Sequence, residues 1–215
     1  MNMLQEAEQQ NKDLQANLKQ CRLQVKAMKK VIAKYSDEIN SFEVKTIPEL
    51  KAFVNPEDAA VKKVAEKLKV EFQNKSGKEY AAQFLPVLSL AAFHFVSSLE
   101  VIGADLPVSF WFTPSDVLEL GAADAFDRVI FLCSLLTNLG ESAKVHVLEV
   151  ESGIRHPVVI TQNAEKIVLY DPFPPANYVS GETQAEALSK FSLAGKPYKK
   201  SLFEFNAVNY EEFGE

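Results

Sequence analysis

Residues 111–140, WFTPSDVLELGAADAFDRVIFLCSLLTNLG, are typical of two capped helices joined by a short turn. Thr113 is followed by Pro114 and then Asp116, a pattern that predicts a helix start because a threonine hydroxyl accepts a free backbone N–H. Gly121 predicts the end of this helix, since glycine adopts positive φ without strain. The stretch therefore predicts a helix, a turn and a second helix.

The second predicted helix begins at residue 125. Asp124 is its predicted N-cap, and Asp127 occupies the third helical position, close to a capping-box pattern. Apolar residues then recur at helical spacing until Gly140: Val129, Leu132, Cys133, Leu135, Leu136 and Leu139. Ala125 is thus the first residue of a largely buried helix, where the helix dipole and unpaired N–H groups would lower the pKa of a thiol. On local signals alone, this is an ordinary capped core helix.

A set of strand and turn patterns follows. Residues 143–150, AKVHVLEV, alternate like a strand, and Ser152-Gly153 marks a turn. His156 opens the next apolar run, HPVVI. Residues 166–170, KIVLY, lead into Asp171-Pro172. These patterns predict consecutive strands packed against the second helix.

In order and spacing, these landmarks resemble transglutaminase-like domains of the archaeal and bacterial type, relatives of papain-like cysteine peptidases. That family has a W-x-T-P run, a G-D-C-x-D turn into a helix ending L-L-x-x-L-G, then a strand-opening His and an Asp-Pro. The matching positions are Trp111, Thr113, Pro114, Asp116, Leu118, Gly121, Asp124, Asp127, Leu135, Leu136, Leu139, Gly140, His156 and Asp171. The resemblance covers about residues 105–175.

The resemblance implies an α+β fold, with helices packed on an antiparallel sheet, and a Cys-His-Asp acyl-transfer site. His156 would be the acid/base, Asp171 would orient it, and residue 125 would be the nucleophile position and supply an oxyanion-hole N–H. The supporting residues that it implies are Trp111, Asp124 and Asp127. The substrate would be a peptide or protein, and analogy with the family favours hydrolysis over transamidation.

The chain departs from the family where the chemistry is most demanding. Ala125 stands in place of the cysteine, and Ala123 in place of a glycine. Either the chain is a natural pseudoenzyme, or a cysteine was replaced by alanine to stop turnover; the retention of His156 and Asp171 favours replacement. A non-catalytic peptide-binding or scaffold module is the alternative function.

The remaining histidines and cysteines have ordinary interpretations. Cys133 lies two helical turns beyond residue 125 and is predicted to be a core thiol. His146 is a weaker candidate for the base than His156, and His94 is predicted to be buried or half-buried in an apolar helix. Three scattered histidines and two distant cysteines predict no metal site, and no nucleotide-binding motif predicts a cofactor.

Composition excludes several classes of protein. The net charge of −6 argues against a general nucleic-acid binder, and 47% hydrophobic residues are ample for a core. No segment has the apolar length of a membrane span. We expect a cytoplasmic protein without a disulfide framework, although a signal or anchor upstream of this sequence would change that expectation.

The N-terminal segment predicts a coiled coil. Residues 1–47 contain neither Gly nor Pro, and apolar residues follow an alternating three-and-four spacing over about five heptads. The seam consists of Leu4, Ala7, Asn11, Leu14, Leu18, Cys21, Val25, Met28, Ile32, Tyr35 and Ile39. A single Asn at an a position is a device for fixing register in a parallel dimer. We therefore expect a coiled-coil helix over 1–45, homo-oligomerisation through 4–39, and a transglutaminase-like domain over 46–215; the alternative is a helix that folds back on its own domain.

Overall fold

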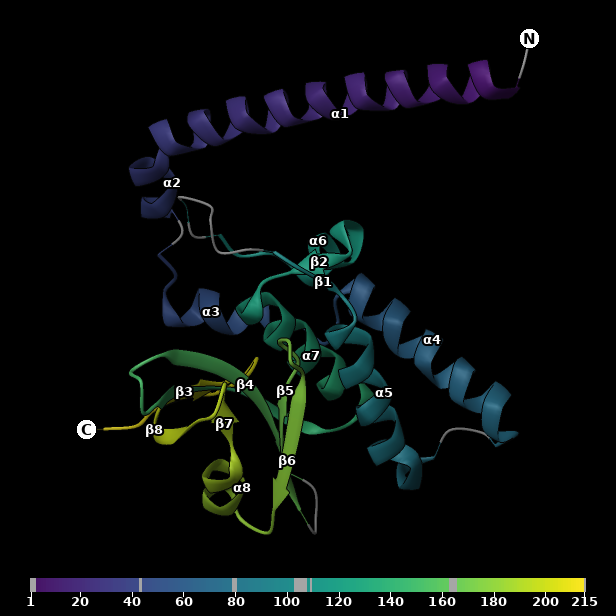
Figure 1. Cartoon of the computed structure of the whole chain (residues 1–215). Coiled ribbons are helices and arrows are strands. Elements are labelled where there is room, and N and C mark those ends of the chain that lie inside the picture. Colours follow the sequence, from purple (N-terminus) through teal and green to yellow (C-terminus); the bar gives the residue numbers. More distant parts are fainter. Residues whose placement is uncertain are drawn as a thin grey trace. The chain divides into compact units, whose positions relative to one another are not determined.

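The computed structural model (Figure 1) describes residues 3–42, 44–78, 81–102, 108, 110–162 and 166–214, with the side chains of 3–8, 42 and 82 left out. The described chain divides into two compact units. One contains the first two helices, and the other contains the remaining helices and the sheet. Within the described ranges, no helix combines the length and apolar content needed to cross a membrane.

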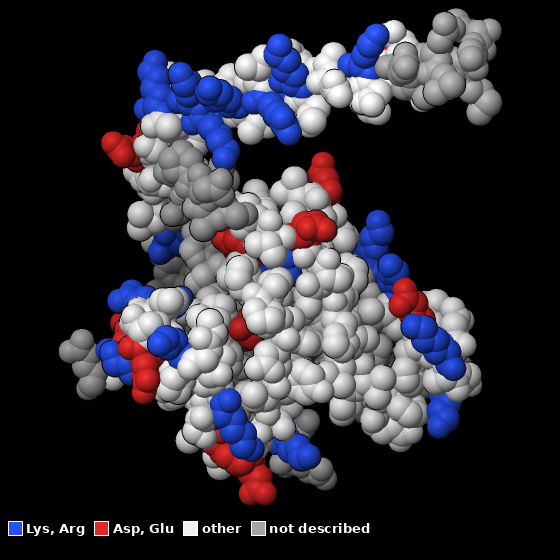
Figure 2. Space-filling view, in the orientation of Figure 1, with Lys and Arg blue, Asp and Glu red and all other residues white. Residues whose placement is uncertain are grey.

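The first unit consists of α1 (Met3–Lys34) and α2 (Ser36–Phe42). The heptad pattern predicts one helix through residue 39, but the helix is interrupted at Tyr35, whose N–H is shared between the Val31 and Ile32 oxygens at 3.3 and 3.1 Å. Several large apolar residues of the predicted heptad seam are exposed in this single chain: Leu14, Leu18, Val25, Met28 and Tyr35. Leu4 and Ala7 lie outside the described side chains. Figure 2 shows Lys and Arg side chains spread along this helical segment.

The second unit opens with a series of helices. They are α3 (Ile47–Phe53), α4 (Ala59–Ser76), the 3-10 helix η1 (Ala82–Phe84), α5 (Leu85–Ser97), α6 (Pro114–Leu120) and α7 (Ala125–Leu139). The predicted caps of the last two are confirmed, because the Thr113 hydroxyl and the Asp124 carboxylate each accept a backbone N–H of the first turn. Gly121 and Gly140 end the two helices at φ of 65° and 107°.

The sheet follows α7. Its strands are β3 (Ser142–Val150), β4 (Arg155–Gln162), β5 (Ile167–Asp171), β6 (Asn177–Gly181), β7 (Ser192–Leu193), β8 (Lys196–Phe205) and β9 (Tyr210–Glu212). Their order is β6-β5-β4-β3-β8-β7, with β9 on β8, and the neighbouring pairs are antiparallel. Two short strands before it, β1 (Glu100–Val101) and β2 (Ala122–Ala123), pair in parallel and lead into α7.

Helices cover both faces of the sheet. On one face, α7 packs with α4 and α5 against residues such as Val145 and Val159. On the other, α8 (Gln184–Lys190) packs over a separate cluster that includes Leu148 and Leu169. Because helices cover both faces of the sheet, β3 is buried at four consecutive positions, from Val145 to Leu148. The predicted α+β fold, with helices on an antiparallel sheet, is confirmed.

Strand β8 begins at Lys196 and ends at Phe205. Asn206 ends it, because its side-chain oxygen accepts the N–H groups of Val208 and Asn209 and forms a side-chain turn. Thr183 caps α8, because its hydroxyl accepts the Glu186 N–H.

Candidate active site

The structure pairs His156 with Asp171 at one end of the sheet. Nε2 of His156 lies 2.9 Å from Oδ2 of Asp171, and the two side chains are 7% and 5% exposed. The other carboxylate oxygen accepts the Phe173 N–H at 3.1 Å. Because a carboxylate only accepts, the ring donates through Nε2, and Nδ1 keeps its lone pair in the neutral ring. We call this pair the dyad; its hydrogen bond fixes the tautomer of the histidine.

Aromatic rings surround the histidine of the dyad. The Phe191 ring stacks on His156 at a centroid distance of 6.2 Å, and the Phe173 ring meets it edge-on at 6.3 Å. His156 lies directly opposite Leu148 on β3, so the two side chains share the α8 face of the sheet. The dyad is therefore shielded from water, which strengthens its hydrogen bond.

Residue 125 is the first residue of α7, as the sequence predicts. Asp124 caps the helix by accepting the Asp127 N–H at 2.8 Å. Ala125 is half-buried, so a side chain at this position has access to solvent. The free N–H groups of the first helical turn give the position a positive electrostatic potential, which would stabilise a thiolate. Alanine provides no nucleophile there.

Arg128 links the first turn of α7 to the residue that follows Asp171. Its fully buried guanidinium donates to the backbone oxygens of Val96, Ser97, Leu99, Ala123 and Pro172. The contact with Pro172, at 3.4 Å, joins α7 to the end of β5. Burial lowers the pKa of Arg128, and the charge of Asp124 opposes this shift. The sequence analysis missed this residue, although a cation inside an apolar helical run is a signal of a buried hydrogen-bonding role.

Asp127 does not complete the predicted capping box. Its Oδ1 instead accepts the Phe112 N–H at 3.1 Å, which holds the segment containing Trp111 against the start of α7. The Trp111 ring packs on Phe126 at 4.8 Å and on Phe53 at 5.5 Å. Asp127 is 1% exposed, and its Oδ2 has no hydrogen-bond partner within the described part of the chain. Burial, followed by the charge of Asp124, raises the pKa of Asp127 to about 7.

The other candidate residues fall outside this site. Cys133 is a buried core thiol, as predicted, and burial raises its pKa to about 12, so it is protonated at neutral pH. His94 is exposed on α5, so the prediction of a buried or half-buried side chain is wrong. His146 belongs to a separate polar cluster on β3 and β8. Among the described residues, no group of three or more His, Cys, Asp or Glu is placed to hold a metal ion.

Comparison with known proteins finds similarity only at the level of structure. No family profile matches the chain, and no curated protein matches it. LapG of Legionella pneumophila is 13% identical, with a TM-score of 0.49, over 86% of this chain and 87% of that chain. Its calcium-bound form is 14% identical, with a TM-score of 0.48, over 71% and 85%. A protein described as a cysteine protease from Cytophaga hutchinsonii is 15% identical, with a TM-score of 0.38, over 81% and 58%.

Proposed function

We propose that the second unit is an acyl-transfer domain of the cysteine-peptidase type, acting on peptide or protein amide bonds, with residue 125 as its nucleophile position. The observation that carries the proposal is the buried His156–Asp171 pair, 2.9 Å apart. A histidine held by a carboxylate in one tautomer is the group that activates a thiol. The capped start of α7 supports the same function, because it would stabilise the thiolate.

With a cysteine at residue 125, the reaction would run in two steps. The thiolate attacks the amide carbonyl carbon, and the imidazolium of His156 gives its proton to the departing amine as the C–N bond breaks. Water, deprotonated by the neutral imidazole, then attacks the thioester carbonyl and releases the acid and the thiolate. With Ala125 no thioester forms, so we expect this chain to bind peptides without cleaving them.

The alanine itself favours a second candidate, a non-catalytic peptide-binding or scaffold module. A chain of this kind would use the same site to hold a peptide. The native gene distinguishes the two histories of residue 125. An alanine codon there identifies a natural pseudoenzyme, whereas a cysteine codon identifies a replaced nucleophile.

The exposed seam of α1 supports the proposal that this segment assembles copies of the chain. Leu14, Leu18, Val25 and Met28 are between 52% and 67% exposed, and they repeat at heptad spacing. Pairing two such helices would bury these side chains against each other. Asn11 at an a position would favour a parallel register.

Restoring the thiol tests the enzyme proposal. Ala125→Cys is made in a Cys21→Ser background, because Cys21 is exposed and would react by itself. The matched control is Ala59→Cys: Ala59 is also the first residue of an Asp-capped helix, α4, but it is not part of the dyad. Reaction rates with an amide-bearing alkylating reagent are measured from pH 5 to 9. Circular dichroism confirms that each variant is folded.

The pH profile decides between the candidates. A thiol paired with the dyad stays a thiolate to low pH, so Ala125→Cys should react at a nearly constant rate down to about pH 5. The Ala59→Cys rate should fall about tenfold per pH unit below its own pKa. Despite the weaker nucleophilicity of a low-pKa thiolate, Ala125→Cys should then be at least ~10-fold faster at pH 5.5. Equal profiles, or a profile unchanged by His156→Gln, would refute the enzyme proposal.

A further inference from the structure

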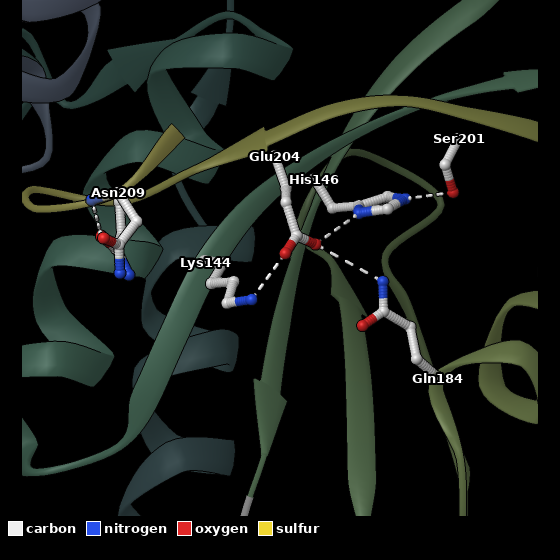
Figure 3. Close-up of polar contacts among 7 residues, drawn as sticks. Lys144, His146, Gln184, Ser201, Glu204 and Asn209 are labelled. Atoms are coloured by element: carbon white, nitrogen blue, oxygen red, sulfur yellow. Dashed lines mark hydrogen bonds and ion pairs between the residues drawn. The ribbon is translucent and has the colours of Figure 1, made fainter. Parts of the chain in front are cut away.

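A second histidine is held between an acid and a serine on the same sheet (Figure 3). Nδ1 of His146, on β3, lies 3.1 Å from Oε2 of Glu204 on β8. Its Nε2 lies 2.9 Å from Oγ of Ser201, also on β8. The order carboxylate, imidazole, hydroxyl, with each ring nitrogen bound to one partner, is the geometry of a serine-hydrolase triad.

The charge on Glu204 determines where the protons lie. Burial raises the pKa of Glu204, but hydrogen bonds from His146 and Lys144 outweigh it and bring the pKa to about 2. The carboxylate therefore only accepts, so Nδ1 of His146 carries the proton, and Nε2 of the neutral ring accepts the Ser201 O–H. The Tyr198 hydroxyl, 2.9 Å from Ser201 Oγ, can donate to that oxygen. Nε2 is thus oriented to take the serine proton.

Irregularities in β8 bring the serine to this face. Glu204 lies opposite His146, so regular alternation would turn Ser201 to the opposite face of the sheet. The register shifts between Val147 and Leu148, which leaves Leu202 as an extra residue and places Ser201 opposite Leu148. A second shift places Tyr198 opposite Val150, on the same face. Bulges that redirect side chains in this way are common beside active sites.

Access to solvent decreases from the serine toward the base. Ser201 is half-buried, whereas His146 is fully buried and Glu204 is 4% exposed. The carboxylate is also held by Lys144 Nζ, 2.5 Å from Oε1, and by Gln184 Nε2, 3.4 Å from Oε2. A reactant can therefore approach the hydroxyl, while the base and its carboxylate stay in a fixed, water-poor setting. A hydroxyl in contact with a base that a third group orients is the arrangement by which enzymes activate a nucleophile.

We propose that Ser201 is the nucleophile of a second acyl-transfer site, with His146 as general base and Glu204 as the residue that orients it. Ser201 Oγ bonds to the acyl carbon of a carboxylic ester as its proton passes to His146 Nε2. That proton goes to the leaving alkoxide when the C–O bond breaks. Water, deprotonated by His146, then attacks the acyl carbon and releases the carboxylic acid and Ser201. This site does not use residue 125, and it goes beyond the function proposed above.

The substrate class follows from the burial of the base. Because His146 has no exposed surface, a leaving group can receive its proton only from Nε2, on the side that faces Ser201 Oγ. An alkoxide needs less proton assistance than an amine does, so this geometry favours esters over amides. A half-buried hydroxyl also favours small acyl groups.

The test uses the full chain with Ala125 in place, so its outcome is independent of the thiol experiment. The chain is treated with a fluorophosphonate probe, and labelled residues are identified by peptide mass spectrometry. Ser180, an exposed serine on β6, is the internal reference. The variants are Ser201→Ala, His146→Gln and Glu204→Gln, and p-nitrophenyl acetate hydrolysis is followed for each.

We expect labelling of Ser201 at least ~100-fold faster than labelling of Ser180, and a similar fall in rate in His146→Gln. Ser201→Ala should remove ester hydrolysis in a chain that circular dichroism shows to be folded, although it leaves the buried Nε2 of His146 without its partner. If His146→Gln fails to fold, two other comparisons replace it. The rate of Ser201 labelling in the parent is compared with the rate in Glu204→Gln, and the rate in the folded parent with the rate in the parent unfolded in urea. Labelling of Ser201 no faster than that of Ser180 in the folded parent, or unchanged hydrolysis in Ser201→Ala, would overturn the proposal.

Discussion

We predict that replacing the buried carboxyl of Asp127 by an amide raises the free energy of unfolding at neutral pH. For most acidic residues that have a hydrogen-bond partner, the same replacement lowers it. One of its oxygens accepts the Phe112 N–H, and the other has no partner within the described residues. In Asp127→Asn, the amide oxygen can still accept from Phe112, and the charge that burial disfavours is gone. The substitution therefore removes the penalty of an ionised, half-satisfied carboxylate while keeping the hydrogen bond that positions the Trp111 segment.

The size of the effect follows from the pKa of Asp127. Folding raises it from a usual value of 3.8 to about 7. Between these values the folded chain holds a proton that the unfolded chain releases, so the free energy of unfolding falls as pH rises. At 1.36 kcal/mol per pKa unit, the loss is about 4 kcal/mol once the pH exceeds 7. Between pH 4 and pH 8 the asparagine variant should gain about 4 kcal/mol of stability relative to the parent. Its unpaired amide N–H costs about 1–3 kcal/mol at both pH values, so the variant should be about 1–3 kcal/mol more stable than the parent at pH 8.

Urea unfolding of parent and variant at pH 4, 6 and 8 measures this difference. The matched control is Asp116→Asn, because hydrogen bonds from the side chain and backbone of Thr113 lower the pKa of Asp116. The ionised Asp116 therefore stabilises the folded chain at any pH above its pKa in the unfolded chain, and this stabilisation is lost as the pH falls through its lower pKa in the folded chain. Asp116→Asn should thus be less stable than the parent at pH 8, and the difference should disappear in acid. If Asp127→Asn is less stable than the parent at pH 8, the carboxylate has a stabilising partner and the argument fails.

Two further predictions concern Arg128 and the N-terminal helix. Arg128→Met should lower the free energy of unfolding by at least ~3 kcal/mol in urea titrations, because it leaves several buried carbonyl oxygens unpaired; Arg155→Met, at an exposed site, should change it by less than ~0.5 kcal/mol. In light scattering, the full-length protein should have a mass of at least twice the 24.0 kDa of one chain. A truncation that begins at Lys45 should have the mass of a single truncated chain; this start keeps Thr46, the N-cap of α3. Single-chain masses for both would refute the coiled coil.

The helix starts and stops of the second unit could be predicted because their causes are local. Thr113, Asp124 and Gly140 each act within a few residues of their own position, so the sequence displays both the capping group and the N–H or C=O that it satisfies. The break at Tyr35 had no such signal, since the heptad spacing continues through it. His156 and Asp171 were predicted as partners from the order of the landmarks, and the structure places them in hydrogen-bond contact.

The residues that the sequence analysis missed depend on contacts between distant segments. The Arg128 hydrogen bonds join α5, the start of α7 and the end of β5, and they reach residues up to 44 positions away from Arg128 in the chain. The pairing of His146 with Ser201 depends on an extra residue in β8, and strand register is not visible in a single sequence. Regular alternation would have placed that serine on the wrong face. The pattern of residue types and their spacing in the sequence therefore identified the dyad, but not the cluster of His146, Ser201 and Glu204.

Leu148 separates Ser201 from the histidine of the dyad. It lies directly opposite His156 on β4 and directly opposite Ser201 on β8, so the three residues form one row across the sheet. Neighbouring strands are about 4.8 Å apart, which places the two polar residues about 10 Å apart on one face. A buried leucine offers no donor or acceptor, so no hydrogen bond runs along this row from Ser201 to His156. A change at Ser201 should therefore leave the pH profile of Ala125→Cys unaltered, and each experiment reports on its own histidine.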